Sequence, residues 1–243
     1  MSKEIKVIGI QRSGTNYLST ILEINYDITS VDTGRDRLPD GSRKYFWKHS
    51  YDPEQYECGT DNDHDVVASG LKRVKEKKIP TILITKNPYF WLESIKRSSG
   101  DIGMKGIPHI KWKRIAIRED HPQTVRLPPG RFDLENVCKM WVDFHSYWIN
   151  NSFPNLLCVR YEDLLADPDK VLQRIEKQFK IRRKQEETKL PERVVMSNSF
   201  DKKRIPRYIA EKQPHISEEE KSMMSSVLTK QILSHYGYGH CLQ

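Results

Sequence analysis

The sequence predicts an α/β fold, in which a single domain has a central parallel sheet flanked by helices and a phosphate-binding loop after the first strand. The prediction rests on three apolar, β-branched runs, each followed by a segment whose apolar residues have helical spacing. These runs are Ile5–Ile10, Thr81–Thr85 and Asn155–Arg160. At 243 residues the chain is long enough for one domain with a sizeable core, so we expect residues 1–243 to form that single domain.

The loop after the first predicted strand suits an anion. Its sequence, QRSGTN, leads into an apolar-periodic segment that begins near Tyr17. A helix that starts directly after a strand aims backbone N–H groups and the positive end of its dipole at an anion. Arg12 adds a permanent positive charge, and Gly14 lets the backbone approach a ligand closely. The hydroxyls of Ser13 and Thr15 are further donors, so we predict that this loop binds phosphate.

The same loop lacks two residues of an ATP- or GTP-hydrolysing P-loop. Gly9 and Gly14 have the G-x-x-x-x-G spacing, but Thr15-Asn16 stands where that motif has Lys followed by Ser or Thr. The Lys would contact the β- and γ-phosphates, and the hydroxyl would bind Mg²⁺. Their absence disfavours an ordinary nucleoside triphosphatase or kinase.

The order basic–Ser–Gly–Thr–x–aromatic, with the basic residue first, resembles the 5′-phosphosulfate loop of the sulfotransferases, which use 3′-phosphoadenosine 5′-phosphosulfate (PAPS) as sulfuryl donor. Two further segments resemble this family, in the same order along the chain. Lys86 and Ser94 have the eight-residue spacing of the family's pair that holds the 3′-phosphate, with Lys in place of the usual Arg. The YEDL segment resembles the one whose Tyr, here Tyr161, hydrogen-bonds the adenine. The resemblance extends from about residue 4 to Tyr238.

The resemblance implies roles for the loop residues. Arg12 would stabilise the charge on the leaving phosphate, and because Arg cannot donate a proton the phosphate would leave as an anion. The neighbouring residues that would bind PAPS are Ser13, Gly14, Thr15 and Asn16. Tyr17 matches the family's aromatic residue that stacks on adenine. The alternative is that Tyr17 is a core tyrosine of the first helix.

The catalytic base is expected in the segment FWKHS. In cytosolic members of the family a Lys-x-His segment at about this point supplies the base, whereas Lys48 and His49 are adjacent here. His49 would take the proton of the acceptor, and Lys48 would stabilise the transferring sulfuryl group. The alternative is a surface Lys-His pair in a loop. Asp52 and Glu93 are reserve bases, since some branches of the family use a carboxylate.

A basic segment, Ser199–Arg207, is predicted to be a loop before the last helix. In the family a basic segment at this point closes over the 3′-phosphate. Three residues are therefore candidates as a group: Lys202, Lys203 and Arg204. The alternative is a solvated charged surface, to which the sequence gives equal weight.

Other helices and two irregular segments complete the predicted domain. Apolar spacing predicts helices over Val66–Lys78 and Phe90–Arg97, and a helix from Leu134 whose buried aromatic face includes His145 as a core residue. Capping signals predict one helix that begins at Asp167-Pro168 and another that runs from Ser217 to about His235. Residues 32–65 and 98–130 are predicted to be irregular and to form the acceptor site or a lid.

Composition bears on partners and compartment. The net charge of +8 favours anionic ligands. The four cysteines have no metal-ligand spacing, so we expect reduced cysteines, no metal and a cytoplasmic protein. The sequence contains no long apolar run for a membrane span and no recognisable signal peptide, so we expect no membrane partner.

The sequence therefore predicts a PAPS-dependent sulfotransferase. The acceptor would be a small molecule or carbohydrate that offers a hydroxyl, or less favourably an amine, and nucleic acid is not expected as a partner. Two alternatives remain. One is an ATP-using, kinase-like P-loop enzyme, which the missing Lys disfavours. The other is a non-catalytic module that binds RNA or another polyanion, which the presence of all three cofactor motifs disfavours.

Overall fold

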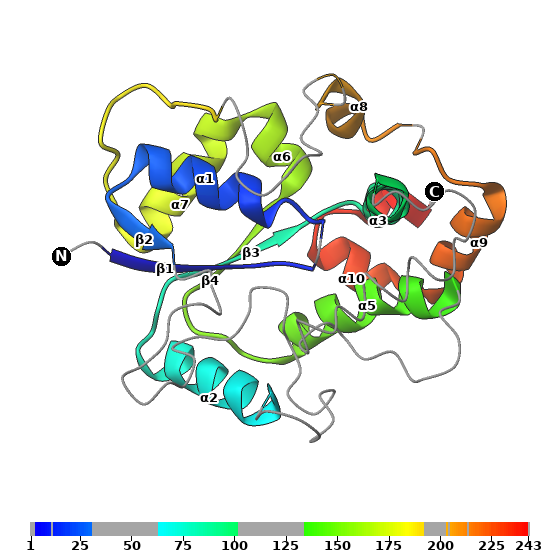
Figure 1. Cartoon of the computed structure of the whole chain (residues 1–243), viewed down its shortest axis with the longest axis horizontal. Coiled ribbons are helices and arrows are strands. Elements are labelled where there is room, and N and C mark those ends of the chain that lie inside the picture. The colour runs from blue at the N-terminus through cyan, green and yellow to red at the C-terminus, as the bar shows by residue number, and fades with distance from the viewer. Residues whose placement is uncertain are drawn as a thin grey trace.

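A single parallel sheet organises the molecule (Figure 1). The computed structural model describes residues 3–10, 12–30, 63–101, 134–191, 203, 205–212 and 214–242. In these residues four strands lie in the order β2-β1-β3-β4, and every neighbouring pair is parallel. The strands are β1 (Lys3–Ile8), β2 (Ile28–Ser30), β3 (Thr81–Thr85) and β4 (Leu156–Arg160). The predicted α/β class is confirmed.

Apolar side chains on the two faces of the sheet belong to two separate core clusters. Ile5, Val7, Ile82, Ile84 and Val159 pack under the helices that lie above the sheet in Figure 1: α1 (Thr15–Asn25), α6 (Tyr161–Ala166) and α7 (Pro168–Phe179). Ile8 and Leu83 pack with the helices of the opposite face: α2 (Asp63–Glu76), α3 (Pro88–Asp101), α5 (Leu134–Asn150), α9 (Glu218–Val227) and α10 (Lys230–His235). Every residue of β3 is buried, as expected for a parallel strand covered on both faces.

The strand order defines a switch point between β1 and β3. The chain leaves β1 through α1 to reach β2 on one side, and it returns through α2 to reach β3 on the other side. In open α/β sheets, ligands bind in the crevice beyond the carboxyl ends of the strands at such a point. The loop 9–14 and the turn Lys86-Asn87 directly follow these two strands.

Several predicted boundaries are corrected by the structure. The segments predicted as irregular are shorter than expected, because Ser98–Asp101 belongs to α3 and Asp63–Asp65 to α2. The helix predicted from Ser217 to about His235 is two helices, α9 and α10. The break occurs because Leu228 is extended, with φ −73° and ψ 139°, and the Thr229 side chain then accepts a hydrogen bond from Ile232 N to cap α10.

Three short elements were not predicted. These are β2, which has only three residues, α6, which begins directly after β4, and α8 (Ile205–Ala210). The helix α8 begins inside the segment Ser199–Arg207, which was predicted to be a loop, and its Pro206 is compatible with the first turn of a helix. The final element is the 3₁₀ turn η3 (Gly239–Leu242).

Local capping and core predictions are confirmed. The Asp167 side chain accepts a hydrogen bond from Lys170 N to cap α7, with Pro168 at the first helical position. Ser217 and Glu220 form a capping box at the start of α9. His145 is fully buried, and it bonds to Thr85 Oγ1 at 2.9 Å and to the carbonyl of Trp141 at 2.6 Å. Among the described residues no helix is long and apolar enough to cross a membrane.

Candidate functional site

Two described residues of the loop after β1 have a left-handed backbone conformation. Arg12 has φ 69° and Gly14 has φ 101°, and Ser13 N donates a hydrogen bond to the carbonyl of Ile10 at 3.1 Å. Gly14 is the N-cap of α1 and provides no side-chain cap. The first N–H groups of a helix have no acceptor within the helix. The end of α1 at this loop can therefore donate hydrogen bonds to an anion.

Ser13 provides a buried hydroxyl in the same loop. Its side chain is fully buried, and among the described residues Ser13 Oγ has no hydrogen-bond partner. A Cβ on Gly9 would lie 2.5 Å from this oxygen, so the loop depends on a glycine there. Because a buried hydroxyl without a partner is costly, Ser13 suits a ligand that offers an acceptor oxygen.

Tyr161, the first residue of α6, packs directly on the loop. A Cβ on Gly14 would lie 2.7 Å from Tyr161 Cε2 and closer still to Cδ2, so only glycine allows this approach. Tyr17 packs edge-on against the same ring, with centroids 6.2 Å apart. Burial raises the pKa of the Tyr161 phenol, the charges of Tyr208, Tyr17 and Glu162 raise it further, and the charge of Arg12 lowers it. Tyr161 is therefore a neutral hydrogen-bonding group that lies within the electrostatic influence of Arg12.

Lys86 and Ser94, the pair predicted for the 3′-phosphate, are in direct contact. Lys86 Nζ donates a hydrogen bond to Ser94 Oγ at 2.7 Å, and both residues are buried. The ammonium also lies 4.9 Å from the centroid of the Tyr161 ring and 4.1 Å from that of Tyr208. Cation–π contacts of this kind are strongest where water is excluded. A positive charge is thus held between two aromatic faces beside the Tyr161 that covers the loop.

Hydrogen bonds that involve backbone groups fix the turn that carries Lys86. The Lys86 carbonyl accepts a hydrogen bond from the indole of Trp141 at 3.1 Å. Asn87 is the residue before Pro88, and its side-chain oxygen accepts from Tyr89 N at 3.1 Å at the start of α3. An Asn cap followed by Pro at the first position is a strong helix start.

The helix α8 covers Lys86, and sequence reasoning missed its role. Tyr208 lies on α8 and is 5% exposed. The preceding residue, Arg207, forms an ion pair with Glu93 on α3, while the other oxygen of Glu93 accepts from His215 N at 2.9 Å. The available signal was the aromatic residue that follows the basic run, in IPRYIA.

The predicted site residues divide into three groups. The structure brings together Arg12, Ser13, Gly14, Tyr17, Tyr161, Lys86 and Ser94 around the loop and the turn after β3, with Thr15 and Asn16 in the first turn of α1. Tyr17 is only 5% exposed, which fits the alternative of a core tyrosine and leaves the adenine contact a prediction. Lys203 is exposed. Lys48, His49, Asp52, Lys202 and Arg204 lie outside the described residues.

One group of possible metal ligands occurs among the described residues, although the sequence spacing did not reveal it. It comprises Glu211, His240 and Cys241, whose ligand atoms lie within 4.8 Å of one another. The Asn87 amide donates to both Glu211 Oε2 and Cys241 Sγ, and Arg160 pairs with Glu211. Because these groups already form a hydrogen-bonded network with a cation beside it, we assign no metal to them.

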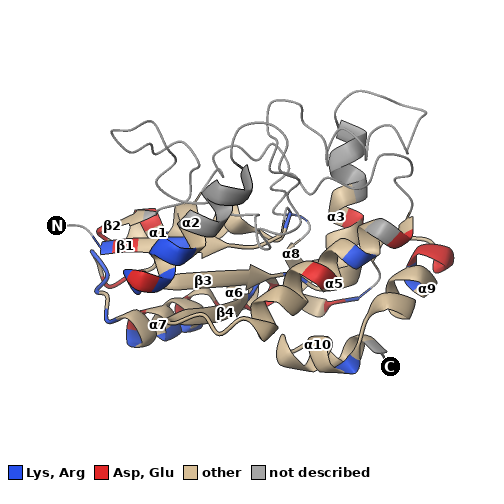
Figure 2. Cartoon of the chain, turned by 90° about the horizontal axis from the view of Figure 1, so that it is seen from below, with Lys and Arg blue, Asp and Glu red and all other residues tan. Residues whose placement is uncertain are grey.

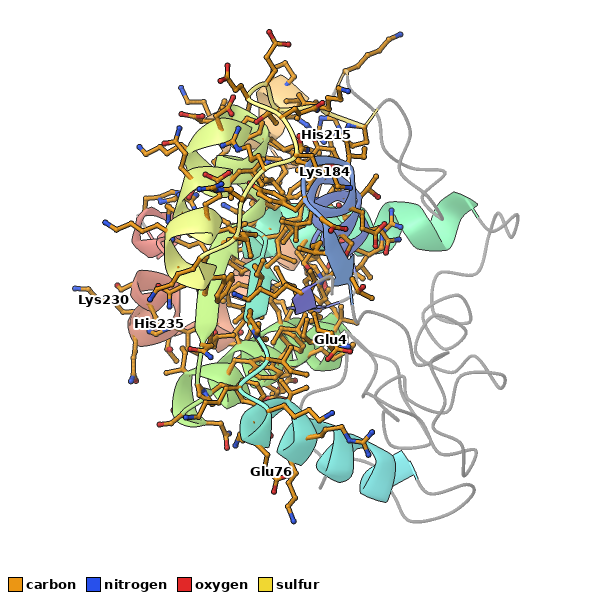
Figure 3. All side chains as sticks on the ribbon, turned by 90° about the vertical axis from the view of Figure 1, so that its left-hand side faces the viewer. Glu4, Glu76, Lys184, His215, Lys230 and His235 are labelled. Atoms are coloured by element: carbon orange, nitrogen blue, oxygen red, sulfur yellow. The ribbon has the colours of Figure 1, made fainter. Side chains whose placement is uncertain are left out.

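The described surface carries both signs of charge. In the view of Figure 2, positions with Lys or Arg and positions with Asp or Glu both occur on the described helices. Figure 3 shows Lys230 and His235 pointing outward from α10 and Glu76 pointing outward from the end of α2.

Comparison with models of known protein families finds no match, and comparison with curated protein sequences finds none either.

Proposed function

We propose that this protein is a sulfotransferase that transfers a sulfuryl group from PAPS to a hydroxyl acceptor. The observation that carries the proposal is the contact between Lys86 Nζ and Ser94 Oγ at 2.7 Å, beside the loop that follows β1. A charged donor and a hydroxyl form a pair suited to one phosphate, and the N-terminus of α1 with Ser13 suits a second. PAPS has phosphate groups at both its 3′ and 5′ positions.

In this proposal the two anion sites position the donor. Lys86 and Ser94 hold the 3′-phosphate, and Tyr161 hydrogen-bonds the adenine. Arg12 and the N–H groups at the start of α1 stabilise the 5′-phosphate, on which negative charge develops during transfer. Because Arg remains protonated, it acts through its charge and not as a proton donor.

The transfer itself is an in-line displacement. The acceptor oxygen forms a bond to sulfur while the bond from sulfur to the bridging oxygen breaks, and that electron pair leaves with the 5′-phosphate. The acceptor proton passes to His49, and Lys48 stabilises the transferring group. PAPS supplies an activated sulfuryl group, and the protein contributes positioning and electrostatic stabilisation.

The test is calorimetric titration with 3′-phosphoadenosine 5′-phosphate, the product nucleotide, in parallel with ATP with and without Mg²⁺. We expect the bisphosphate to bind and ATP to bind far more weakly. The Lys86→Ala variant should bind the bisphosphate about 10- to 100-fold more weakly, because a charge-assisted hydrogen bond is lost.

The matched control is Lys230→Ala, since Lys230 is an exposed lysine of α10 whose side chain points outward (Figure 3). It should bind the bisphosphate like the unmodified protein. If both variants lost the same affinity for the bisphosphate, the effect of Lys86→Ala would come from the change in net charge and not from a specific contact. Absence of bisphosphate binding in the unmodified protein would exclude the proposed function, and tight binding of Mg²⁺-ATP would then identify the kinase-like alternative.

A further inference from the structure

Tyr238 is a buried residue of the segment that follows α10, and its hydroxyl reaches the base of the candidate site. It donates a hydrogen bond to Glu162 Oε2 at 2.8 Å. The other oxygen, Glu162 Oε1, accepts from Asn87 N at 3.0 Å. Tyr238, Glu162 and Asn87 are 0%, 2% and 3% exposed, so this chain of hydrogen bonds is shielded from water. One buried carboxyl therefore connects the end of the fold to the turn after β3.

The peptide between Lys86 and Asn87 is held at both of its polar groups. Its N–H donates to Glu162, and its C=O accepts from the indole of Trp141 at 3.1 Å. The ring of Tyr238 packs against Trp141, with centroids 6.5 Å apart. Tyr238 thus contacts both groups that orient this peptide. The orientation of the peptide sets the direction in which the Lys86 side chain leaves the backbone.

A second connection leads to the same turn through Arg160. Its guanidinium lies 4.5 Å from the centroid of the Tyr238 ring, and it pairs with Glu211. Glu211 in turn accepts a hydrogen bond from the Asn87 amide at 2.8 Å. The Lys86-Asn87 turn is therefore bound to the Tyr238 segment through its backbone and through the Asn87 side chain.

We propose that Tyr238, acting through Glu162 and the backbone of Asn87, is a positioning residue that orients the Lys86 ammonium for a phosphate ligand. The identity of the ligand as a 3′-phosphate rests on the proposed function. The orientation of Lys86 is a separate matter, and it can be measured without any nucleotide.

The first measurement uses the ring currents that act on Lys86. Tyr161 and Tyr208 place ring faces 4.9 and 4.1 Å from Nζ, so the Lys86 ε-proton resonances should be displaced upfield. Lys86→Arg assigns these resonances by removing them. Tyr238→Phe should move them toward ordinary lysine positions. Tyr236→Phe is the matched control, because this phenol is also buried and donates to the carbonyl of His145 at 3.0 Å instead. Unmoved resonances in Tyr238→Phe would overturn the proposal.

The second measurement compares 3′-phosphoadenosine 5′-phosphate with adenosine 5′-phosphate. Tyr238→Phe should weaken binding of the bisphosphate about five- to tenfold and change the affinity for the monophosphate less than twofold. In a Lys86→Ala background it should add no further loss. Equal losses for both nucleotides, or an equal loss in Tyr236→Phe, would mean a merely structural role and would overturn the proposal.

Glu162→Gln keeps the shape of the side chain and serves if Tyr238→Phe fails to fold. A carboxamide has only one acceptor oxygen, so either Tyr238 or Asn87 loses its acceptor, and the same resonance shift is expected. If the unmodified protein binds no bisphosphate while the Lys86 resonances still depend on Tyr238, the proposed function is wrong and the positioning role stands. If the bisphosphate binds through Lys86 but the Lys86 resonances do not move in Tyr238→Phe, the positioning role is wrong.

Discussion

Gly14 and Tyr161 lie so close that the ring of Tyr161 occupies the space where any other residue at position 14 would place its Cβ. The contact joins the loop after β1 to the first residue after β4, and thus connects two strands that are not neighbours in the sheet. A glycine that would allow close approach to a ligand is also required by the protein's own packing.

Gly14→Ala should destabilise the protein by about 2–4 kcal/mol, because φ 101° is unfavourable for alanine and the added carbon overlaps the Tyr161 ring. Urea unfolding measures the change. Gly239→Ala is the control, since its Cβ would meet Ser234 Oγ at an ordinary 3.5 Å. A similar loss in both variants would contradict a specific role for the Tyr161 contact.

Glu93→Gln should destabilise the protein by about 1–3 kcal/mol, because it removes the charge that pairs with the partly buried Arg207. The backbone amides of α8 should also exchange hydrogen faster, since this ion pair joins α8 to α3. Hydrogen exchange followed by mass spectrometry measures the second effect. Glu187→Gln, an exposed carboxylate in the segment after α7, should change neither quantity.

His145 should stay neutral through the mildly acidic range, because burial lowers its pKa to about 3, while its backbone hydrogen bond to Trp141 acts in the opposite direction. The unfolded chain takes up this proton near pH 6.5. Stability contributed by the neutral ring is therefore complete above about pH 6.5 and falls by about 1.4 kcal/mol per unit as the pH drops toward 3. The ring-proton resonance of His145 should not move between pH 8 and pH 4, with free histidine in the sample as the reference. Movement near pH 6 would show that the ring is charged in the fold.

Ser217→Ala should cost about 1 kcal/mol, because the hydrogen bond that Ser217 Oγ accepts from Glu220 N at the start of α9 is lost. Thermal or urea unfolding is sufficient to detect this change. Ser226→Ala changes the same residue type inside α9, where the hydroxyl is exposed and bonds to the Met223 carbonyl. It should leave stability within about 0.5 kcal/mol. If the two variants behaved alike, the cap would contribute nothing of its own.

Local signals in the sequence predicted several of the helix starts and strands. Asp167-Pro168 and the Ser217 capping box involve residues within one turn of each other, so propensity and hydrogen bonding are decided locally. Lys86 and Ser94 were paired through the resemblance to the sulfotransferases, and in the structure Lys86 Nζ lies 2.7 Å from Ser94 Oγ. The phosphate that they would hold remains a prediction.

Contacts between distant segments were not predictable in this way. Tyr208 reaches Lys86 across more than a hundred residues, and Tyr238 reaches Glu162 from a separate segment. The spacing of apolar residues indicates which side chains face the core, but it does not indicate which side chains they contact there. Short elements were missed for a related reason. The helices α6 and α8 have 6 residues each and contact each other, and helices this short are marginal without tertiary packing.

The position of Tyr238 in the chain also has a consequence for biosynthesis. A domain generally folds as a unit, so its fold is complete only after all of its packed segments have been translated. The loop after β1, the turn after β3 and Tyr161 are all made well before the residue that bonds to Glu162. A nascent chain that has reached α6 therefore contains Glu162 but not yet the hydroxyl that bonds to its Oε2. The Tyr238 hydroxyl becomes available only after α10 has been translated.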